Sequence, residues 1–469
     1  MDVQFWGAAR EVPGSMHLVT ANGRQVLLDC GLFHGSSEEE FERNRHFPFD
    51  PRSIDAVVLS HAHIDHCGNL PTLVKAGFGG PIYATSATRD LCTHMLMDSA
   101  EIHEYDAEDM NRRREREGKQ PMEALYTRRE ATNALERFRS IEYYQTFNPV
   151  DGLETRLLDA GHILGSASVQ LDARENGRTT RLVFSGDIGR RGLPILRDPD
   201  TPVGADALIM ESTYGDRLHE PPARAREILR EAVTKVIADG GMLLIPAFAL
   251  GRTQEVAYQF NALVEAGELP DIDVFVDSPL AADVTEVFRL HPECFDDLAK
   301  HALLEDRDGD VFGFERMRFT KDVQESIALN RREEPAVIIA SSGMCTGGRI
   351  VHHLKFHGIN PASIILFVGY QAEGTLGRRI LDGERKVSLY GDRRELRARV
   401  RRADSYSAHA DRNGLLGWAR EAAGKGDVKR IFLVHGEEDA MRALSAGLRE
   451  QGAPAVEMPE RGQKFTLGA

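Results

Sequence analysis

A dense group of histidines and carboxylates occupies residues 60–68, which read Ser-His-Ala-His-Ile-Asp-His-Cys-Gly. Three imidazoles and one carboxylate fall within six positions there, at His61, His63, Asp65 and His66. A single histidine after a strand is usually a hydrogen-bonded polar residue or a cap, but this density is hard to explain structurally. Neutral imidazole and carboxylate suit zinc, and a catalytic zinc ion keeps one position for water. The run therefore predicts a catalytic metal centre, in which Asp65 and His66 face a second ion about 3.5–4 Å from the first.

Two ions need more ligands than this run supplies, and residues of the right type recur after hydrophobic runs elsewhere. These residues are Asp29 after Val-Leu-Leu, His162 in Asp-Ala-Gly-His, Asp187 in Phe-Ser-Gly-Asp and His435 in Phe-Leu-Val-His. Taken singly, most of them fit a turn or a cap better than a ligand. Their shared placement after hydrophobic strands, however, favours ligands that converge on one rim.

The segments that must position these residues follow two patterns. Up to about residue 85, and again over 155–210, short β-rich runs are bounded by turns, which is typical of a sheet-rich layer arrangement. Between 86 and 147 apolar positions recur at helical spacing, and a capping box at Thr127 and Glu130 predicts the start of a second helix, so we expect a helical hairpin. From about 222 to 386 helical runs alternate with buried-looking strands, which indicates a parallel α/β unit.

A chain of 469 residues with 42% hydrophobic content can bury a large core, and this length favours two domains over one. Because the α/β pattern interrupts the sheet-rich pattern, we expect an insertion. The predicted organisation is a first domain over 1–210, an inserted domain over 211–386 and a return to the first domain over 387–469.

Composition limits the class of protein. The five cysteines are scattered and form no Cys-x-x-Cys pair, so neither a disulfide framework nor a structural zinc site is predicted. No apolar run is long enough for a signal peptide or for the ~18 residues of a membrane span. We therefore expect a cytoplasmic protein that does not associate with membranes.

The formal net charge of −15 argues against indiscriminate electrostatic binding to a polyanion. The stretch 385–402 is the exception, because it holds eight basic residues against two acidic ones. By itself such a stretch is usually a solvated charged face.

The motifs resemble those of the metallo-β-lactamase superfamily and, within it, the β-CASP nucleases. His-Ala-His-Ile-Asp-His, Asp-Ala-Gly-His and Ser-Gly-Asp match the metal motifs in order. Glu211 in Met-Glu-Ser-Thr-Tyr-Gly-Asp, His409 in Ser-Ala-His-Ala-Asp, and His435 match the marks of the β-CASP branch. The resemblance covers nearly the whole chain, which is similar to bacterial and archaeal relatives of the cleavage-and-polyadenylation endonuclease subunit. It implies an α/β fold, namely an αββα sandwich with an inserted parallel α/β domain.

The resemblance also implies two zinc ions per chain and assigns their ligands. These are His61, His63 and His162 for one ion and Asp65, His66 and His435 for the other, with Asp187 bridging the two. Asp29 would lie just outside the ligands and contact them.

Hydrolysis of a phosphodiester bond is the chemistry that such a centre predicts. A hydroxide shared by two zinc ions is a strong nucleophile near neutral pH, and the ions neutralise a phosphate oxygen. The departing sugar oxygen needs a proton, for which His409 paired with Glu211 is the candidate general acid, since an adjacent carboxylate raises the imidazolium population. The catalytic candidates are Asp65, Glu211 and His409. The resemblance implies products with 5′-phosphate and 3′-hydroxyl ends.

RNA, in single-stranded form, is the expected substrate. The family places a histidine at the position of His435 in its RNA-cutting members, whereas its DNA-cutting members tend to lack it. The basic stretch 385–402 leads toward His409, so we expect it to line a cleft that tracks the RNA backbone with little sequence preference. Weaker candidates for substrate contact lie in a Gly-Arg-Thr motif and a glycine-rich loop: Arg252, Thr253, Ser341, Ser342, Gly343, Gly347, Gly348 and Arg349.

Three other readings stay open at this stage. A small-molecule hydrolase of the thioesterase or lactonase type shares the metal motifs, and a DNA-processing nuclease shares the fold. A non-catalytic scaffold would typically have lost metal ligands, and none of the expected ligands is missing. The sequence leaves endonuclease and 5′-exonuclease activity, a homodimer, and the role of segment 86–147 undecided.

Overall fold

The computed structural model describes residues 1–33, 38–175, 177–306, 309–424 and 428–468. It divides the chain into two compact units, the first formed by residues 1–191, 198–218 and 409–469 and the second by residues 192–197 and 219–408. The second unit thus continues beyond residue 386, where the sequence places its end. The reason is that β19 (Arg399–Arg402) pairs in parallel with β16 (Ile364–Phe367) and belongs to the sheet of the second unit.

Two β-sheets form the centre of the first unit. Within the described residues, one sheet has the strand order β22 (Lys464–Thr466), β1 (Asp2–Gly7), β2 (Met16–Ala21), β3 (Arg24–Leu28), β4 (Ala56–Val58), β5 (Ile82–Ala84) and β6 (Phe138–Ser140). The other has the order β21 (Val456–Glu457), β20 (Arg430–Val434), β11 (Ala207–Glu211), β10 (Arg178–Phe184), β9 (Ala167–Glu175), β8 (Leu153–Asp159) and β7 (Phe147–Val150).

The two sheets pack face to face because each presents an apolar face. In β1 the burial alternates, with Val3 and Phe5 fully buried, as expected for a strand with one face in the core. These side chains share one core cluster with Leu157, Phe184 and other residues of the opposite sheet. The packing fixes the strand ends, where the candidate ligands lie.

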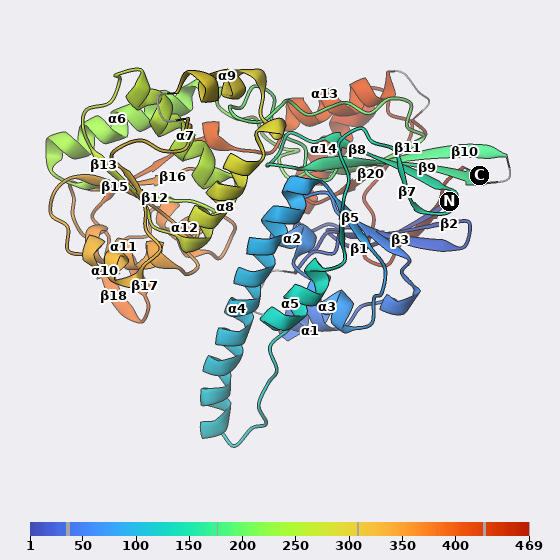
Figure 1. Ribbon diagram of the computed structural model, residues 1–469, viewed down its shortest axis with the longest axis horizontal. Helices are drawn as coiled ribbons and strands as arrows, with labels where there is room; N and C mark the ends of the chain where they lie inside the picture. The colour runs from blue at the N-terminus through green and yellow to red at the C-terminus, as the bar shows by residue number, and fades with distance from the viewer. Residues whose placement is uncertain (34–37, 176, 307–308, 425–427, 469) are drawn as a thin grey trace. The chain divides into compact units, whose positions relative to one another are not determined.

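Helices cover the outer faces of both sheets (Figure 1). Those beside β1, β3 and β5 are α1 (Glu38–Arg45), α2 (Ile64–Cys67), α3 (Leu70–Lys75), α4 (Ser86–Arg116) and α5 (Arg128–Leu135). On the other side, α13 (Arg412–Ala423) and α14 (Glu438–Glu450) pack against β11 and β20 through a second apolar cluster. The predicted αββα sandwich is therefore confirmed.

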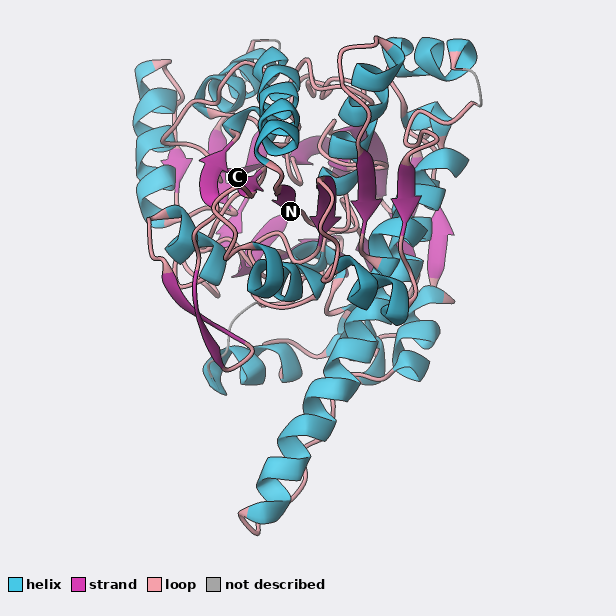
Figure 2. Ribbon diagram, turned by 90° about the vertical axis from the view of Figure 1, so that its left-hand side faces the viewer, coloured by secondary structure: helices cyan, strands magenta, loops and turns pink. Residues whose placement is uncertain are grey.

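Helix α4 begins with Thr85, whose side chain accepts a hydrogen bond from the Thr88 amide. Its 31 residues carry it well beyond the sandwich (Figure 2), and no residue after Ala107 in this helix is buried. The predicted capping box at Thr127 and Glu130 is present at the start of α5.

The second unit is built on a parallel sheet, as the alternating pattern predicts. Within the described part of the chain, its strand order is β14 (Met317–Phe319), β13 (Asp273–Val276), β15 (Ala336–Ala340), β12 (Met242–Pro246), β16 and β19. Every pair in this order is parallel. The helices are α6 (Ala223–Asp239), α7 (Arg252–Glu265), α8 (Pro279–Leu290), α9 (Asp297–Glu305), α10 (Val323–Leu329), α11 (Arg349–His357) and α12 (Leu376–Leu381). A separate hairpin is formed by β17 (Lys386–Leu389) and β18 (Asp392–Glu395).

The central strands of this sheet are buried on both faces, which explains why their sequences are continuously apolar. Leu243 and Ile339 belong to a core cluster on one face, whereas Leu244 and Ile338 belong to the cluster on the other. Among the described helices, none combines the length and apolarity that crossing a membrane requires. Cytoplasmic location stays a prediction.

A buried carboxylate crosslinks the second unit just after β13. Asp277 is fully buried and accepts hydrogen bonds from Ser326 Oγ at 2.6 Å, Arg349 Nη1 at 2.7 Å and His353 Nε2 at 2.7 Å. Burial acts to raise the pKa of Asp277, but the hydrogen bonds from His353 and Ser326 outweigh it and hold that pKa below 3.8. The carboxylate is therefore ionised and joins α10 and α11 to the sheet.

Asp277→Ala should destabilise the second unit by about 3 kcal/mol, because it leaves the Arg349 and His353 side chains without their buried partner. Hydrogen exchange of peptides that span β13 and β15 measures this loss. The matched control is Asp271→Ala, since Asp271 is 88% exposed and pairs with Arg316 at 3.5 Å, a contact worth less than about 1 kcal/mol. Equal protection of these peptides from hydrogen exchange in Asp277→Ala and Asp271→Ala would contradict the role of Asp277.

Candidate metal centre

The candidate ligands lie at the carboxyl ends of strands in the first unit. Asp29 follows β3, and His61 and His63 lie in the loop between β4 and α2. Strands β10, β11 and β20 are parallel, so their carboxyl ends meet at one edge of their sheet. Asp187 lies just beyond the end of β10, and His435 directly follows β20. The fold therefore delivers residues that are far apart in sequence to one place.

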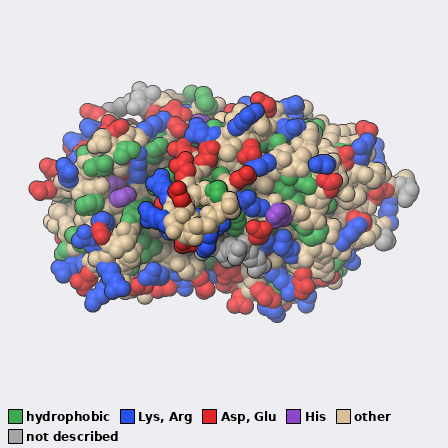
Figure 3. All heavy atoms as spheres, turned by 90° about the horizontal axis from the view of Figure 1, so that it is seen from below, with side chains coloured by type: hydrophobic (Ala, Val, Ile, Leu, Met, Phe, Trp, Pro, Cys, Tyr) green, Lys and Arg blue, Asp and Glu red, His purple; other side chains and the backbone are tan. Residues whose placement is uncertain are grey.

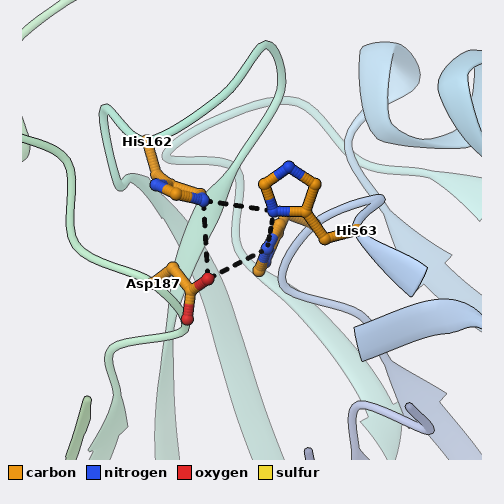
Figure 4. Close-up of side chains that lie close together, drawn as sticks. His63, His162 and Asp187 are labelled. Carbon is orange, nitrogen blue, oxygen red and sulfur yellow. Dashed lines mark hydrogen bonds and ion pairs between the residues drawn. The ribbon is translucent and has the colours of Figure 1, made fainter. Parts of the chain in front are cut away.

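The first cluster contains His61, His63, His162 and Asp187. His63 Nδ1 lies 3.1 Å from His61 Nε2 and 3.2 Å from His162 Nε2. The Oδ2 atom of Asp187 lies 3.3 Å from His61 Nε2 and 3.4 Å from His162 Nε2. Figure 4 shows the rings of His63 and His162 turned toward each other, with the carboxylate of Asp187 beside His162. Ligand atoms bonded to a tetrahedral zinc ion at about 2.0–2.1 Å lie roughly 3.3–3.4 Å apart, so these separations fit a divalent ion.

The second cluster contains Asp65, His66 and His435, and each offers one ligand atom within 4.8 Å of the others. His435 Nε2 lies 3.3 Å from Asp65 Oδ2. The second oxygen of Asp187, Oδ1, lies 3.3 Å from His66 Nε2. Asp187 thus directs one oxygen to each cluster, which is the geometry expected of a bridging ligand.

Unpaired buried atoms provide a test of whether the residues fit a metal. His66 Nε2 and Asp187 Oδ1 are buried and have no hydrogen-bond partner among the described residues, although they lie 3.3 Å apart. Such atoms are rare in folded proteins, because each costs the desolvation of a polar group. A cation between them would satisfy both, so the donor set fits two divalent ions.

The protonation states of five candidate ligands suit metal binding, which requires unprotonated groups. Burial lowers the pKa of His61, lowers that of His63 to about 3 and lowers that of His162 well below 6.5. Burial acts to raise the pKa of Asp65 and Asp187, but neighbouring histidines outweigh it and hold both well below 3.8. The imidazoles of His61, His63 and His162 are therefore neutral and these carboxylates ionised. His66 differs: burial acts to lower its pKa, but the Asp187 and Asp29 carboxylates outweigh it and raise the pKa well above 6.5, so His66 must release a proton when it binds metal.

Asp29 lies behind His66, as the sequence predicts. It is fully buried and accepts hydrogen bonds from Ser15 Oγ at 3.1 Å, from the Ser60 amide at 2.8 Å and from Ser60 Oγ at 2.9 Å. His66 Nδ1 lies 2.7 Å from Asp29 Oδ2. Because Asp29 holds Nδ1, the Nε2 atom of His66 faces Asp187. Ser15 and Ser60 were not predicted, because ordinary serines carry no sequence signal for this role.

Glu211 and His409 form a pair beside the first cluster. Glu211 is fully buried at the end of β11, and its Oε1 atom accepts a hydrogen bond from the Ile188 amide at 2.7 Å and lies 3.1 Å from His409 Nδ1. His409 Nδ1 is also 4.0 Å from Asp187 Oδ2. Burial acts to lower the pKa of His409, but the Glu211 and Asp187 carboxylates outweigh it and raise the pKa to about 9. His409 therefore carries a proton at neutral pH.

The first two candidates for substrate contact lie at the start of α7 in the second unit. Arg252 is 8% exposed and forms an ion pair with Glu255. Thr253 Oγ1 donates a hydrogen bond to the carbonyl of Phe248 at 2.8 Å. Both side chains thus take part in local contacts, and substrate binding by them stays a prediction.

The glycine-rich loop 341–349 of the second unit also uses polar groups to hold its own shape. The Ser342 hydroxyl accepts hydrogen bonds from the amides of Thr346 at 3.0 Å and Gly347 at 3.4 Å. Ser341 Oγ lies 3.1 Å from Ser278 Oγ. These two amides are therefore already bonded, which weakens the expectation that the loop presents them to a phosphate.

Two glycines of this loop are required by close approaches. A Cβ atom on Gly348, which has φ +76°, would lie 2.4 Å from the carbonyl oxygen of Ser341, and one on Gly343 would lie 2.8 Å from the Phe248 ring. Arg349 donates to Asp277 and to the carbonyls of Thr320 and Lys321. Substrate binding by these three residues also stays a prediction.

Ion pairs neutralise part of the basic stretch 385–402. Its arginines at 399, 401 and 402 pair with Asp239, Glu231 and Asp404. On the face shown in Figure 3, basic and acidic side chains are interspersed. The stretch is therefore less positive in the folded protein than its composition suggests.

Comparisons with known proteins identify the family. Residues 9–247 match the metallo-beta-lactamase superfamily, residues 253–380 the Beta-Casp domain and residues 393–458 the Zn-dependent metallo-hydrolase RNA specificity domain. The chain belongs to the metallo-β-lactamase superfamily and to its β-CASP branch. The resemblance inferred from the motifs is therefore confirmed.

Several curated proteins are similar over nearly the whole chain. Ribonuclease TTHA0252 of Thermus thermophilus is 38% identical over 454 residues, which cover 96% of this chain and 97% of that protein. The transcription termination factor FttA of Methanocaldococcus jannaschii is 32% identical, over 93% of this chain and 67% of that protein. An RNase J-like protein of the same organism is 29% identical, over 93% of this chain and 92% of that protein. A solved structure from Enterococcus faecalis, described as a protein of unknown function, shares the fold with a TM-score of 0.55 at 15% identity, over 99% of each chain.

Asp187→Ala should bind almost no metal, because the Asp187 carboxylate faces both clusters. Elemental analysis after dialysis against zinc and then against metal-free buffer measures this loss. Asp151→Ala is the matched control, since Asp151 is exposed in the turn between β7 and β8. A wild-type metal content in Asp187→Ala would contradict the bridging position.

Proposed function

We propose that this protein is a zinc-dependent ribonuclease that hydrolyses phosphodiester bonds of single-stranded RNA. The observation that carries the proposal is that two ligand clusters and a protonated His409 all face the carboxylate of Asp187. The match to an RNA specificity domain and the relatives described as ribonucleases support RNA as the substrate.

Two zinc ions are the proposed cofactors. His61, His63 and His162 would hold one ion, Asp65, His66 and His435 the other, and Asp187 both. When bound, such ions provide a strong nucleophile at neutral pH and neutralise charge on the phosphate. The protein supplies neutral imidazoles and ionised carboxylates that are fixed in place by buried hydrogen bonds.

His409 is the proposed general acid. Its Nδ1 atom is held by Glu211, so the proton that it can transfer is the one on Nε2. This proton passes to the departing sugar oxygen, which leaves a 3′-hydroxyl end and, on the other fragment, a 5′-phosphate. Glu211 keeps the imidazolium oriented and stabilises its charge.

Asp65 is the proposed residue that contacts the attacking water. Its side chain is 22% exposed, whereas that of Asp187 is 2% exposed, so solvent reaches Asp65 more readily. An ionised carboxylate at this position can accept a hydrogen bond from the water and orient it.

Digestion of matched RNA and DNA oligomers, beside a panel of thioesters and lactones, tests the substrate class. We expect zinc-loaded protein to cleave the RNA fastest, a chelator to abolish cleavage and added zinc to restore it. Internal and 5′ labels on the RNA distinguish endonuclease from 5′-exonuclease products. Faster turnover of DNA, a thioester or a lactone would overturn the proposal in favour of that class.

His409→Ala should keep its metal and lose about 10²- to 10⁴-fold in the rate of RNA cleavage, the typical contribution of a general acid. Single-turnover rates measured beside elemental analysis test both parts. His46→Ala is the control, because the His46 side chain is 75% exposed. A metal-replete His409→Ala protein that cleaves at the wild-type rate would exclude His409 as the acid.

A further inference from the structure

We propose that Thr213 is a positioning residue that fixes the tautomer and the orientation of His435, a proposed ligand of the second ion. The inference deepens the proposed function and rests on its metal centre. Thr213 lies in the motif Glu-Ser-Thr-Tyr-Gly, from which the sequence singles out only Glu211.

The Thr213 hydroxyl contacts two atoms of the same residue. Oγ1 lies 3.0 Å from Nδ1 of His435 and 3.2 Å from the backbone carbonyl oxygen of His435. A hydroxyl has one proton to donate, and a carbonyl oxygen can only accept. Donation to the carbonyl uses the single hydroxyl proton, and Oγ1 is then left to accept a hydrogen bond from Nδ1–H, which is the arrangement proposed for His435.

This arrangement leaves the lone pair of the imidazole on Nε2, which lies 3.3 Å from Asp65 Oδ2. Two electron-rich atoms at that distance repel each other unless a cation lies between them. The other carboxylate oxygen near Nδ1 is Asp187 Oδ1, but at 3.6 Å it is beyond normal hydrogen-bond length. Thr213 is therefore the group that selects the tautomer able to bind metal through Nε2.

The same hydroxyl stabilises an unusual backbone conformation. His435 has φ 49°, in the left-handed region that non-glycine residues rarely adopt. Strands β11 and β20 pair up to Glu211 and Val434, and beyond them Ser212 Oγ donates to the Val434 carbonyl at 2.7 Å. Thr213, the next residue, adds a second link between the two segments. Its hydroxyl contacts both the ring and the backbone carbonyl of His435.

His66, in the same cluster, has an equivalent partner in Asp29, which holds its Nδ1 at 2.7 Å. A group that forms a hydrogen bond with the ring nitrogen that does not bind the metal orients a ligating histidine. Removal of such a group typically costs about 10- to 100-fold in metal affinity. Thr213 is the corresponding partner of His435.

The experiment compares Thr213→Val, which removes the hydroxyl at nearly constant volume, with Thr213→Ser, which keeps it. Thr155→Val is the matched control, because Thr155 is fully buried and its hydroxyl has no hydrogen-bond partner within the described part of the chain. Zinc affinities are measured by competition with a chelating dye. We expect Thr213→Val to bind the proposed second ion, the one that His435 would hold, about 10- to 100-fold less tightly, and Thr213→Ser and Thr155→Val to bind both ions as the wild type does.

A second readout does not depend on activity or on bound metal. In metal-free protein labelled with ¹⁵N-histidine, at a pH where His435 is neutral, the wild type should show the Nδ1–H tautomer of His435, assigned by its loss in His435→Gln. An Nε2–H tautomer in the wild type would overturn the proposal, even if Thr213→Val fails to fold.

The remaining outcomes separate this inference from the proposed function. Unchanged zinc affinities in Thr213→Val overturn the role of Thr213 and leave the metal centre standing. A wild-type protein that binds no zinc overturns both.

Discussion

The carboxylate of Asp187 lies between the two ligand clusters, with one oxygen directed to each. It is 2% exposed, ionised and surrounded by imidazoles, with His61 and His162 on Oδ2 and His66 on Oδ1. A buried charge is costly unless it is paired, and the neutral imidazoles of His61 and His162 beside Oδ2 do not pair it. The site therefore favours a cation beside Oδ2. Beside Oδ1, positive charge is supplied either by a proton on His66, whose pKa the Asp187 and Asp29 carboxylates raise well above 6.5, or by a metal ion in its place. The same negative charge, with that of Glu211, keeps the proton on His409.

The sandwich meets this constraint by bringing ligands from both sheets to strand ends. One sheet supplies Asp29 and the loop that carries His61, and the other supplies Asp187, Glu211 and His435. The apolar contacts between the sheets hold these ends at fixed separations, and the ligand atoms of the first cluster lie 3.1–3.4 Å apart. Hydrogen bonds from Ser15, Ser60 and Thr213 then orient the groups that the packing has placed. Core packing thus sets where the ligands are, and buried hydroxyls set which atoms they present.

Much of this was predictable from the sequence where the signal is local. The run at residues 60–68 identifies the site because its ligands are neighbours, and apolar alternation predicts both the sandwich and the parallel sheet. Glu211 and His409 are 198 residues apart, so only the family resemblance paired them. Thr213 was missed because its partner is 222 residues away and a threonine has many uses. The sequence places the boundary at 386, before β19, because β19, with the sequence Arg-Val-Arg-Arg, lies at a sheet edge, where charged residues are tolerated and strand patterns are weak.

Anomalous X-ray diffraction at the zinc absorption edge, on crystals of the wild-type protein grown with zinc, would locate the bound ions without a measurement of activity. We expect two strong peaks, one among His61, His63, His162 and Asp187 and the other among Asp65, His66, His435 and Asp187. An absence of peaks at these positions, or peaks only elsewhere in the protein, would contradict the proposed metal centre.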